Sequence, residues 1–327
     1  MKLLRSPISL FSIFSLIAVT ISLSGSVVQS QSRPTIKIDG SSTVFPITEA
    51  VAEDFQKSNN SSNPNNARVT VGVSGTGGGF KKFCSTNPSV QTHISNASRP
   101  IKPSEQQACK QAGVEYIELP VAYDAITIVV SKQNTAVSDI KVDELQKMWL
   151  SQSQRQGIKK WNQIRSSWPN SEFKLYGPGL DSGTYDYFKE AILDDKDIRS
   201  DFSGSEDDNV LVRGIQNNPN AIGYFGLAYY KENTDKLKSL KINGVAPTTT
   251  TVNNGSYSPL SRPIYIYVNK AAADKPEVKA FVEYYLQTAS KFSAEVGYVA
   301  LPNNDYSSAQ RRFTNRQTGR VPLRAGL

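Results

Sequence analysis

Short apolar segments recur along this chain, and in most of them β-branched or aromatic side chains stand at every second position. This period of two predicts β-strands, which we place at residues 36–38, 69–73, 114–119, 125–130, 174–176, 221–225 and 264–268. Between them, apolar residues at helical spacing predict helices at 49–56, 104–112, 142–150, 185–193, 209–216 and 276–286. Such alternation indicates an α/β fold, in which ligands bind at the carboxyl ends of the strands.

At three places a predicted strand runs into a segment rich in glycine and hydroxyl residues that precedes a helix. These segments are 40–46 (Gly-Ser-Ser-Thr-Val-Phe-Pro), 74–79 (Ser-Gly-Thr-Gly-Gly-Gly) and 177–184 (Gly-Pro-Gly-Leu-Asp-Ser-Gly-Thr). Glycine lets a backbone approach a ligand closely, and the first N–H groups of a helix have no partner inside the helix. The segments therefore suit an anion. The alternative for each is an ordinary helix N-cap.

Neither nucleotide nor nucleic-acid binding is favoured. None of the three segments has the Gly-x-x-x-x-Gly-Lys-Ser/Thr spacing or the full Gly-x-Gly-x-x-Gly spacing. The formal net charge is +8, with Arg311, Arg312, Arg316, Arg320 and Arg324 near the carboxyl end. These arginines are spaced among polar residues, so we predict a solvated face and not a nucleic-acid surface.

Residues 1–30 are predicted to be a cleaved secretory signal peptide. Lys2 and Arg5 precede an apolar segment at 8–23, and small polar residues follow up to Ser30. The alternative is a membrane anchor, but serines and threonines interrupt the apolar segment and make it marginal for a span. Since it contains no lipobox cysteine, we expect a periplasmic protein without a lipid anchor.

The two cysteines, Cys84 and Cys109, are predicted to form a disulfide, because exported chains with an even cysteine count commonly do so. A bridge over such a loop stabilises a fold by roughly 3 kcal/mol. With His93 as the single histidine and no Cys-x-x-Cys, we expect no metal site and no Ser-His-Asp triad. Binding is therefore favoured over enzymatic activity.

Six short segments, 40–46, 74–79, 96–102 (Asn-Ala-Ser-Arg-Pro-Ile-Lys), 181–184, 220–224 and 297–302, occur in an order that resembles the PstS family. These are the phosphate-binding proteins of bacterial ABC transporters, and the resemblance is strongest to the cyanobacterial SphX branch. It implies a two-lobed, type II periplasmic-binding-protein fold. It also implies a monomer that needs no cofactor and delivers phosphate to the permease and ATPase subunits of a transporter.

In that fold the ligand cleft lies between two lobes joined by two chain crossings, which we expect near 122–124 and 257–259. Lobe I would then comprise 31–124 plus 257–327, and lobe II 125–256. By motif, the resemblance places on the phosphate Ser42, Thr43, Thr76, Ser182, Gly183 and Thr184. Neutral donors satisfy the many lone pairs of a dehydrated phosphate without a counter-charge that would oppose release.

The sequence departs from the family at two places. Arg99 stands where the best-known members have an aspartate that accepts the phosphate hydrogen, and the region before Ser182 has Pro178 and no arginine. We expect Arg99 to supply the guanidinium and Asp181 the acceptor. The alternatives are that Arg99 pairs with Asp181 or Asp124 away from ligand, and that Asp181 only caps a helix.

Two other functions stay open. If no carboxylate lines the pocket, sulfate, arsenate or another oxyanion is favoured more as the ligand. A secreted phosphoester enzyme would need a nucleophile with a base, or two metal ions. Ser182 beside Asp181 is a poor pair for this, and the acidic run 206–208 reads as a solvated loop.

Overall fold

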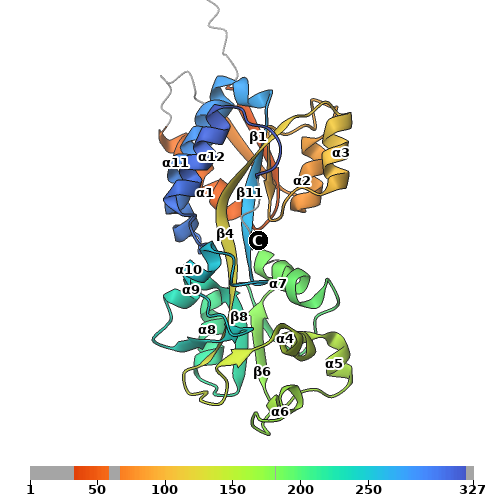
Figure 1. The fold of residues 1–327 in the computed structure, drawn as a ribbon, viewed down its shortest axis with the longest axis vertical. Coiled ribbons are helices and arrows are strands. Elements are labelled where there is room, and N and C mark those ends of the chain that lie inside the picture. Colours follow the sequence, from red (N-terminus) through yellow and green to blue (C-terminus); the bar gives the residue numbers. More distant parts are fainter. Residues whose placement is uncertain (1–32, 59–66, 181, 322–327) are drawn as a thin grey trace, which may run out of the picture. The chain divides into compact units, whose positions relative to one another are not determined.

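The computed structural model describes residues 33–58, 67–180 and 182–321, so the predicted signal peptide and Asp181 lie outside the described residues. Within these ranges the main sheet has nine strands, in the order β2-β1-β3-β11-β4-β8-β6-β7, with β9 also paired to β4 (Figure 1). Its strands are β1 (Thr35–Gly40), β2 (Arg68–Val73), β3 (Ile94–Ala97), β4 (Tyr116–Ser131), β6 (Lys174–Pro178), β7 (Ser203–Ser205), β8 (Ala221–Gly226), β9 (Leu237–Ser239) and β11 (Ser261–Asn269). Strands β5 (Asp139–Ile140) and β10 (Lys241–Ile242) form a separate pair.

Each predicted helix is present, and most of the ends differ by at most four residues, but the helix that begins at Pro276 continues nine residues beyond its predicted end at residue 286. The α-helices are α1 (Phe45–Ser58), α2 (Gly75–Phe83), α3 (Pro103–Gln111), α4 (Val142–Trp149), α5 (Ser151–Arg155), α6 (Trp161–Ile164), α7 (Gly183–Leu193), α8 (Asp208–Gln216), α9 (Leu227–Lys231), α10 (Thr249–Asn253), α11 (Pro276–Glu295) and α12 (Asn303–Thr314). The sequence did not predict α12, although Tyr306, Ala309 and Phe313 are buried at helical spacing, because arginines and polar residues surround them. Among the described residues, no helix combines the length and the apolar character that a membrane span requires.

One long strand, β4, replaces two strands predicted at 114–119 and 125–130. It pairs antiparallel with β11 from Tyr116 to Ala125 and with β8 from Ile126 to Val130 (Figure 1). Pro120 cannot donate to a ladder, and a register shift in β11 lies opposite it. The pairing with β11 thus carries the strand past the proline. The change of partner lies beside the predicted first crossing, and the lobe boundaries remain a prediction.

The glycine-rich segment after β2 is helical and not a loop ahead of a helix. Helix α2 begins at Gly75, so Thr76 lies in its first turn. Gly79 has to be small, because a Cβ there would lie 2.6 Å from Gly40 Cα. The helix therefore packs directly onto the end of β1, which explains the glycines by close packing as well as by exposed N–H groups.

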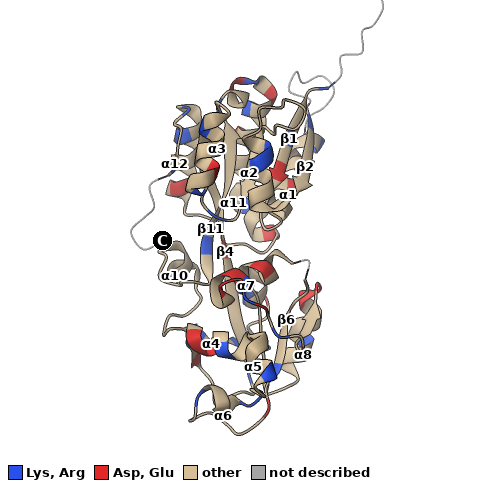
Figure 2. Cartoon of the chain, turned by 90° about the vertical axis from the view of Figure 1, so that its right-hand side faces the viewer, with Lys and Arg blue, Asp and Glu red and all other residues tan. Residues whose placement is uncertain are grey.

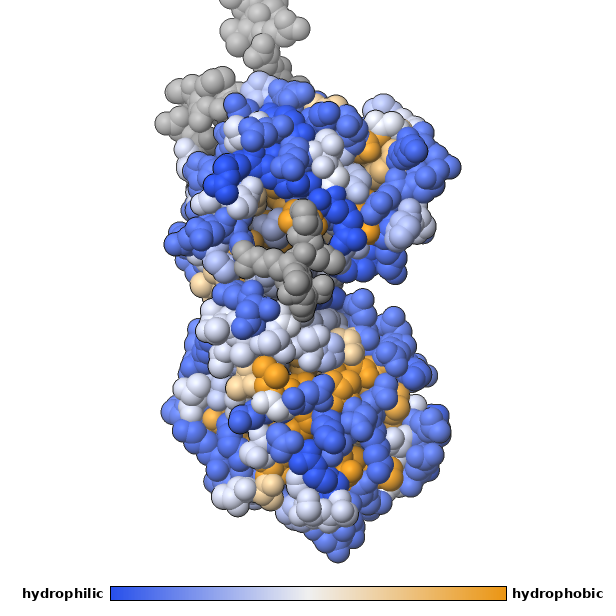
Figure 3. Space-filling model, in the orientation of Figure 1, coloured by the Kyte–Doolittle hydropathy of each residue, from blue (hydrophilic) through white to orange (hydrophobic). Residues whose placement is uncertain are grey.

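Aromatic side chains fill the core on both parts of the sheet. Phe55 of α1 packs edge-on against Phe281 of α11, with ring centroids 5.3 Å apart. Around β8, Phe188 of α7 stacks on Tyr224 at 3.9 Å. Figure 3 shows a mostly hydrophilic surface in this view, with apolar residues gathered around β6 and β8. Helix α7, which begins at a predicted site segment, is thus fixed to the sheet by its buried face.

The predicted disulfide is confirmed. Cys84 follows the last residue of α2, Cys109 lies in α3, and their Cα atoms are 4.4 Å apart. The bridge holds these two helices together, as expected from the sequence.

The predicted solvated basic face is wrong for Arg312, which is only 7% exposed. Its guanidinium donates to the carbonyl oxygens of Thr318 and Arg320 at 3.1 and 3.2 Å, and its Nε donates to Glu118 O at 3.1 Å. Arg312 thereby holds the last described residues against β4. The reason is structural: a buried guanidinium here satisfies several carbonyl groups at once.

Candidate anion-binding site

Three hydroxyl-bearing segments leave the sheet at one edge. Strands β1, β2 and β3 are parallel, and Gly40 is paired in register with Val73 and with Asn96. Ser41 N donates to Asn96 O at 3.0 Å, and Ser74 N donates to Gly40 O at 3.1 Å. These bonds hold the starts of the segments together at the carboxyl ends of the strands, where an α/β sheet binds its ligands.

Thr43 is buried, and its backbone is fully engaged. Its N–H donates to Ser41 Oγ at 3.2 Å, and its carbonyl accepts from the Tyr298 hydroxyl at 2.7 Å. The sequence-based expectation included the N–H of Thr43 among the anion donors, but that N–H has a partner within the protein. What remains for a ligand is the Thr43 hydroxyl, beside half-buried Ser42.

The first segment touches the start of α7. A Cβ on Gly183 would lie 2.8 Å from Thr43 Oγ1 and 3.2 Å from Thr43 Cα. Ser182 is the N-cap of α7, and its Oγ accepts from Thr184 N at 3.2 Å. The ordinary capping role predicted as the alternative is therefore present at Ser182. The contact nevertheless brings two of the three predicted segments together.

Thr76 and Ser98 form the remaining hydroxyl pair. Thr76 Oγ1 lies 3.2 Å from Ser98 Oγ and accepts from Ser98 N at 3.2 Å. At Thr76, as at Ser182, the hydroxyl oxygen already accepts a backbone N–H. Because a hydroxyl has a single proton to donate, an oxygen held in this way is left with its O–H as a donor. This arrangement suits a ligand whose oxygen atoms accept hydrogen bonds.

Arg99 has a different partner from those expected. Its NH1 and NH2 donate to the two carboxylate oxygens of Glu105 at 2.9 and 2.8 Å, and NH1 also donates to Pro100 O. Hydrogen bonding to Glu105 raises the pKa of Arg99 further above its usual value. Arg99 NH2 also lies 4.0 Å from where a Cβ on Gly77 would stand. The Arg99 guanidinium thus lies beside the first turn of α2, but it is already paired with the Glu105 carboxylate.

Arg262, which the sequence analysis missed, lies against Thr43. Its NH2 is 3.5 Å from Thr43 Oγ1, its Nε is 3.4 Å from Asp124 Oδ2, and its NH1 donates to Glu190 Oε2 at 2.9 Å. The predicted strand began two residues later, at Ile264, which left Arg262 between the expected chain crossing near 257–259 and that strand. The available signal was an arginine at the entry of an otherwise apolar strand.

Acidic residues near the segments are mostly engaged. Asp39 accepts from Lys82 Nζ at 2.6 Å and from the Ser74 hydroxyl. Asp124 is 3% exposed, and burial raises its pKa while Arg262 opposes that rise. Figure 2 shows the acidic positions of α7 and the basic positions of α2. Asp124 is the acidic residue that is both deeply buried and next to Arg262.

A cavity of about 330 Å³ opens beside these residues, and Asp124, Thr184, Asp208 and Tyr298 help to line it. Burial, Asp207 and Glu206 raise the pKa of Asp208 to about 6. In the described part of the chain, no three His, Cys, Asp or Glu side chains are grouped so as to hold a metal ion. Within the acidic run 206–208, Asp207 is the N-cap of α8, and its carboxylate accepts from Asn209 N.

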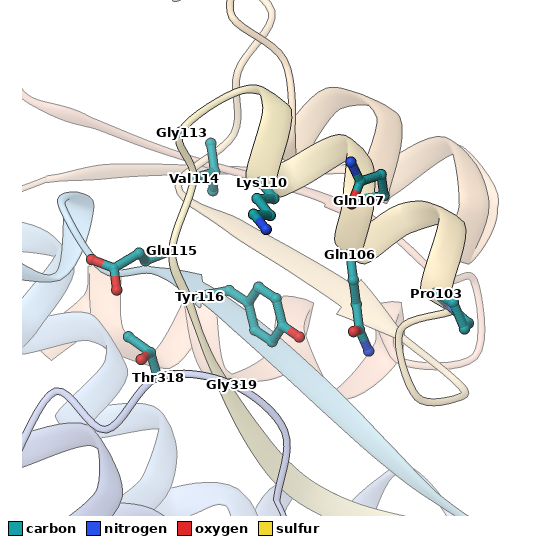
Figure 4. A pocket seen from close by; sticks show the side chains of 10 residues that line it. All are labelled: Pro103, Gln106, Gln107, Lys110, Gly113, Val114, Glu115, Tyr116, Thr318 and Gly319. Atoms are coloured by element: carbon teal, nitrogen blue, oxygen red, sulfur yellow. The ribbon is translucent and has the colours of Figure 1, made fainter.

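A larger cavity, of about 490 Å³, lies between α3, the start of β4 and residues 318–319 (Figure 4). It is lined by Lys110, Glu115 and Tyr116, among others, and by none of the hydroxyl-bearing segments. We therefore place the candidate site at the strand ends and not in this cavity.

Residues 26–289 match a family model described as a PBP superfamily domain. The chain is 51% identical over 297 residues to protein SphX from Synechococcus elongatus, covering 89% of this chain and 85% of that protein. It is 39% identical over 284 residues to the phosphate-binding protein PstS from Staphylococcus saprophyticus, covering 85% of this chain and 84% of that protein.

A solved structure agrees with these matches. The crystal structure of a possible phosphate binding protein from Planctomyces limnophilus has a TM-score of 0.79 and 39% sequence identity, and the match covers 88% of this chain and 100% of that chain. The predicted α/β fold of the type II periplasmic binding proteins is thereby confirmed.

Proposed function

The chain belongs to the PstS family of phosphate-binding proteins, and we propose on that basis that it binds inorganic phosphate and delivers it to an ABC transporter. The observation that supports this function most directly is the contact between Thr43 and Gly183. It joins two hydroxyl-bearing segments from distant parts of the chain, each at the carboxyl end of a strand or the start of a helix.

The proposed phosphate donors follow from that contact. Hydroxyl groups come from Ser42, Thr43, Thr76 and Ser182, and backbone N–H groups from the first turn of α7 at Gly183. Thr184 belongs to the same turn, where the helix dipole favours an anion. The hydroxyls of Thr76 and Ser182 already accept backbone N–H groups, which supports their role as donors.

Arg99 and Asp181 complete the proposed site. Arg99 lies beside the first turn of α2, and its pairing with Glu105 makes the pair nearly neutral. Such a pair would position the turn more than it would attract phosphate. Asp181, just before the α7 cap, is proposed to accept the hydrogen of hydrogen phosphate, which sulfate lacks.

We also propose that phosphate closes two lobes, comprising 31–124 plus 257–327 and 125–256. Thr43 and Thr76 belong to the first, and Ser182 to Thr184 belong to the second. Because the donors come from both lobes, the anion is fully surrounded only when the two lobes approach each other. Bound phosphate therefore stabilises the closed form.

The setting that we propose is the periplasm, reached after cleavage of residues 1–30. The partners are the permease and ATPase subunits of the transporter, and the binding protein acts as a monomer without nucleic acid or cofactor. This assignment rests on family membership and on the N-terminal sequence pattern.

A phosphoester enzyme has no comparable support. The relatives are named as binding proteins, and the chain is a binding protein in the same sense. His93 accepts from Lys37 N at 3.1 Å, its Nε2 lies 3.1 Å from Lys275 Nζ, and burial lowers its pKa to about 4. The His93 side chain is therefore held by contacts with Lys37 and Lys275, and it does not act as a base for Ser182.

Calorimetric titration of ligand-free mature protein with phosphate, arsenate and sulfate tests the proposal. We expect one phosphate per chain and much weaker sulfate binding. No heat with phosphate, or equal binding of sulfate, would contradict it. Turnover of p-nitrophenyl phosphate by pure protein, with or without divalent metals, would instead support the enzyme.

A further inference from the structure

Arg262, at the start of β11, contacts three other elements around the proposed phosphate site. Its NH2 lies 3.5 Å from Thr43 Oγ1, after β1. Its Nε lies 3.4 Å from Asp124 Oδ2 in β4, and its NH1 donates to Glu190 Oε2 in α7 at 2.9 Å. One guanidinium thus reaches both segments that the Thr43–Gly183 contact joins.

The orientation of this guanidinium is fixed by packing. The Arg262 side chain is 13% exposed, and its Cζ lies 3.7 Å from the centre of the Tyr187 ring. Tyr187 is itself held, because its hydroxyl donates to Pro259 O at 2.7 Å. A guanidinium stacked on an aromatic ring keeps its plane and loses little freedom when it forms further hydrogen bonds.

The two carboxylate partners of Arg262 differ in exposure. The Asp124 side chain is 4% exposed, whereas that of Glu190 is 50% exposed. Breaking a buried ion pair is costly, because it leaves a charge without solvent. An exposed ion pair contributes little free energy, so another anion can readily replace its carboxylate. Glu190 is therefore the partner that another anion can replace, while Asp124 keeps the guanidinium in place.

We propose that Arg262 contacts the bound phosphate and that Glu190 occupies the same guanidinium when no anion is bound. This inference rests on the proposed function. Arg262 NH2 lies 3.5 Å from Thr43 Oγ1. A phosphate oxygen that accepts from the Thr43 hydroxyl is therefore also within reach of Arg262 NH2. The planar fork of arginine fits two phosphate oxygens. Phosphate and Glu190 are thus competing anions for one cation.

The test is calorimetric titration with inorganic phosphate of the mature wild type and four variants. Arg262→Gln removes the charge, and Arg262→Lys keeps it without the fork. Glu190→Gln removes the competitor. Glu172→Gln is the control, because Glu172 is 47% exposed and paired with Lys159 at 2.7 Å, just before the amino end of β6. Thermal unfolding without phosphate checks that each variant is folded.

We expect Arg262→Gln to weaken binding about tenfold to a hundredfold, as for the loss of a charged hydrogen bond. Arg262→Lys should recover part of that loss. Glu190→Gln should strengthen binding about twofold to fivefold, since exposed pairs are weak, and Glu172→Gln should leave it unchanged. A purely structural Arg262–Glu190 pair would give weaker binding in both variants.

Wild-type affinity in Arg262→Gln, or weaker binding in Glu190→Gln, overturns this inference while the proposed function stands. Absence of phosphate binding by the wild type overturns the proposed function and this inference with it. The two failures are therefore distinguishable in one set of titrations.

Discussion

Gly183 lies so close to Thr43 that a methyl group on Gly183 would stand 2.8 Å from Thr43 Oγ1. The two residues come from segments on opposite sides of the proposed cleft. Their approach leaves no room for a side chain, so the glycine of the 181–184 motif is required by packing as well as by its N–H. The close contact makes the first prediction specific.

Gly183→Ala should weaken phosphate binding by about tenfold, because overpacking of this kind costs roughly 1–3 kcal/mol. The melting temperature without phosphate should change little, since alanine is favourable in a helix. Gly226→Ala is the matched control, because its methyl group would lie 3.5 Å from Gly297 O, an ordinary contact. Titration showing equal affinities for the two variants would argue against the contact at Gly183.

Removing the disulfide should lower the free energy of unfolding by about 2–4 kcal/mol. The variant is Cys84→Ser with Cys109→Ser, measured by chemical denaturation beside the wild type. Thiol counting on denatured, unreduced wild type should find no free thiol. Two titratable thiols would show that the bridge is absent from the protein in solution.

Asp181→Asn should lower phosphate affinity about tenfold to a hundredfold, from roughly 1.5–3 kcal/mol for a charged hydrogen bond. It should also narrow the preference for phosphate over sulfate, because the charge that repels sulfate is lost. Asp207→Asn, at the cap of α8, controls for loss of a capping carboxylate. An unchanged preference in competition titrations would direct the search to Asp124, whose neighbour is Arg262.

Phosphate should reduce the radius of gyration of the mature protein. Donors from both proposed lobes can reach one anion only when the lobes are close, so the ligand favours the compact form. Small-angle scattering with and without saturating phosphate measures this. Superimposable profiles would mean that binding occurs without closure.

Stability should fall as pH rises from about 4 to about 6, in part through Asp208. Its pKa is raised to about 6, so in this range the folded protein holds a proton that the unfolded chain has released. Asp208→Asn should flatten this dependence and add roughly 1–3 kcal/mol at pH 7. Denaturation curves at several pH values give the free energy of unfolding as a function of pH for the variant and the wild type. The same pH dependence in both proteins would exclude Asp208 as its source.

The sequence was sufficient to predict those features for which the local residue pattern and the side-chain chemistry indicate the same structure. Alternating strands, the helices between them and the pairing of Cys84 with Cys109 could all be read from short segments. The hydroxyl-bearing segments were recognised for the same reason, since glycine, serine and threonine have a local meaning at the ends of strands and helices.

The features that could not be predicted depend on contacts that a local sequence pattern does not specify. Nothing local to Arg262 indicates that it meets Thr43, and nothing local to Arg99 excludes Asp124 as a partner in favour of Glu105. The continuous strand β4 was missed because Pro120 reads as a break, while its pairing with β11 is visible only in the fold.

Strand β11 lies between β3 and β4 in the sheet, although it follows them by more than a hundred residues in the chain. A growing polypeptide therefore cannot complete its first half until residues 261–269 have been synthesised. Until then, the edges of β3 and β4 that face β11 are unpaired, although β3 can pair with β1 and β4 with β8. Because such non-local pairing is slow to form, we expect the part of the sheet that contains β1, β2 and β3 to be completed only after β11 has been synthesised, late in the growth of the chain.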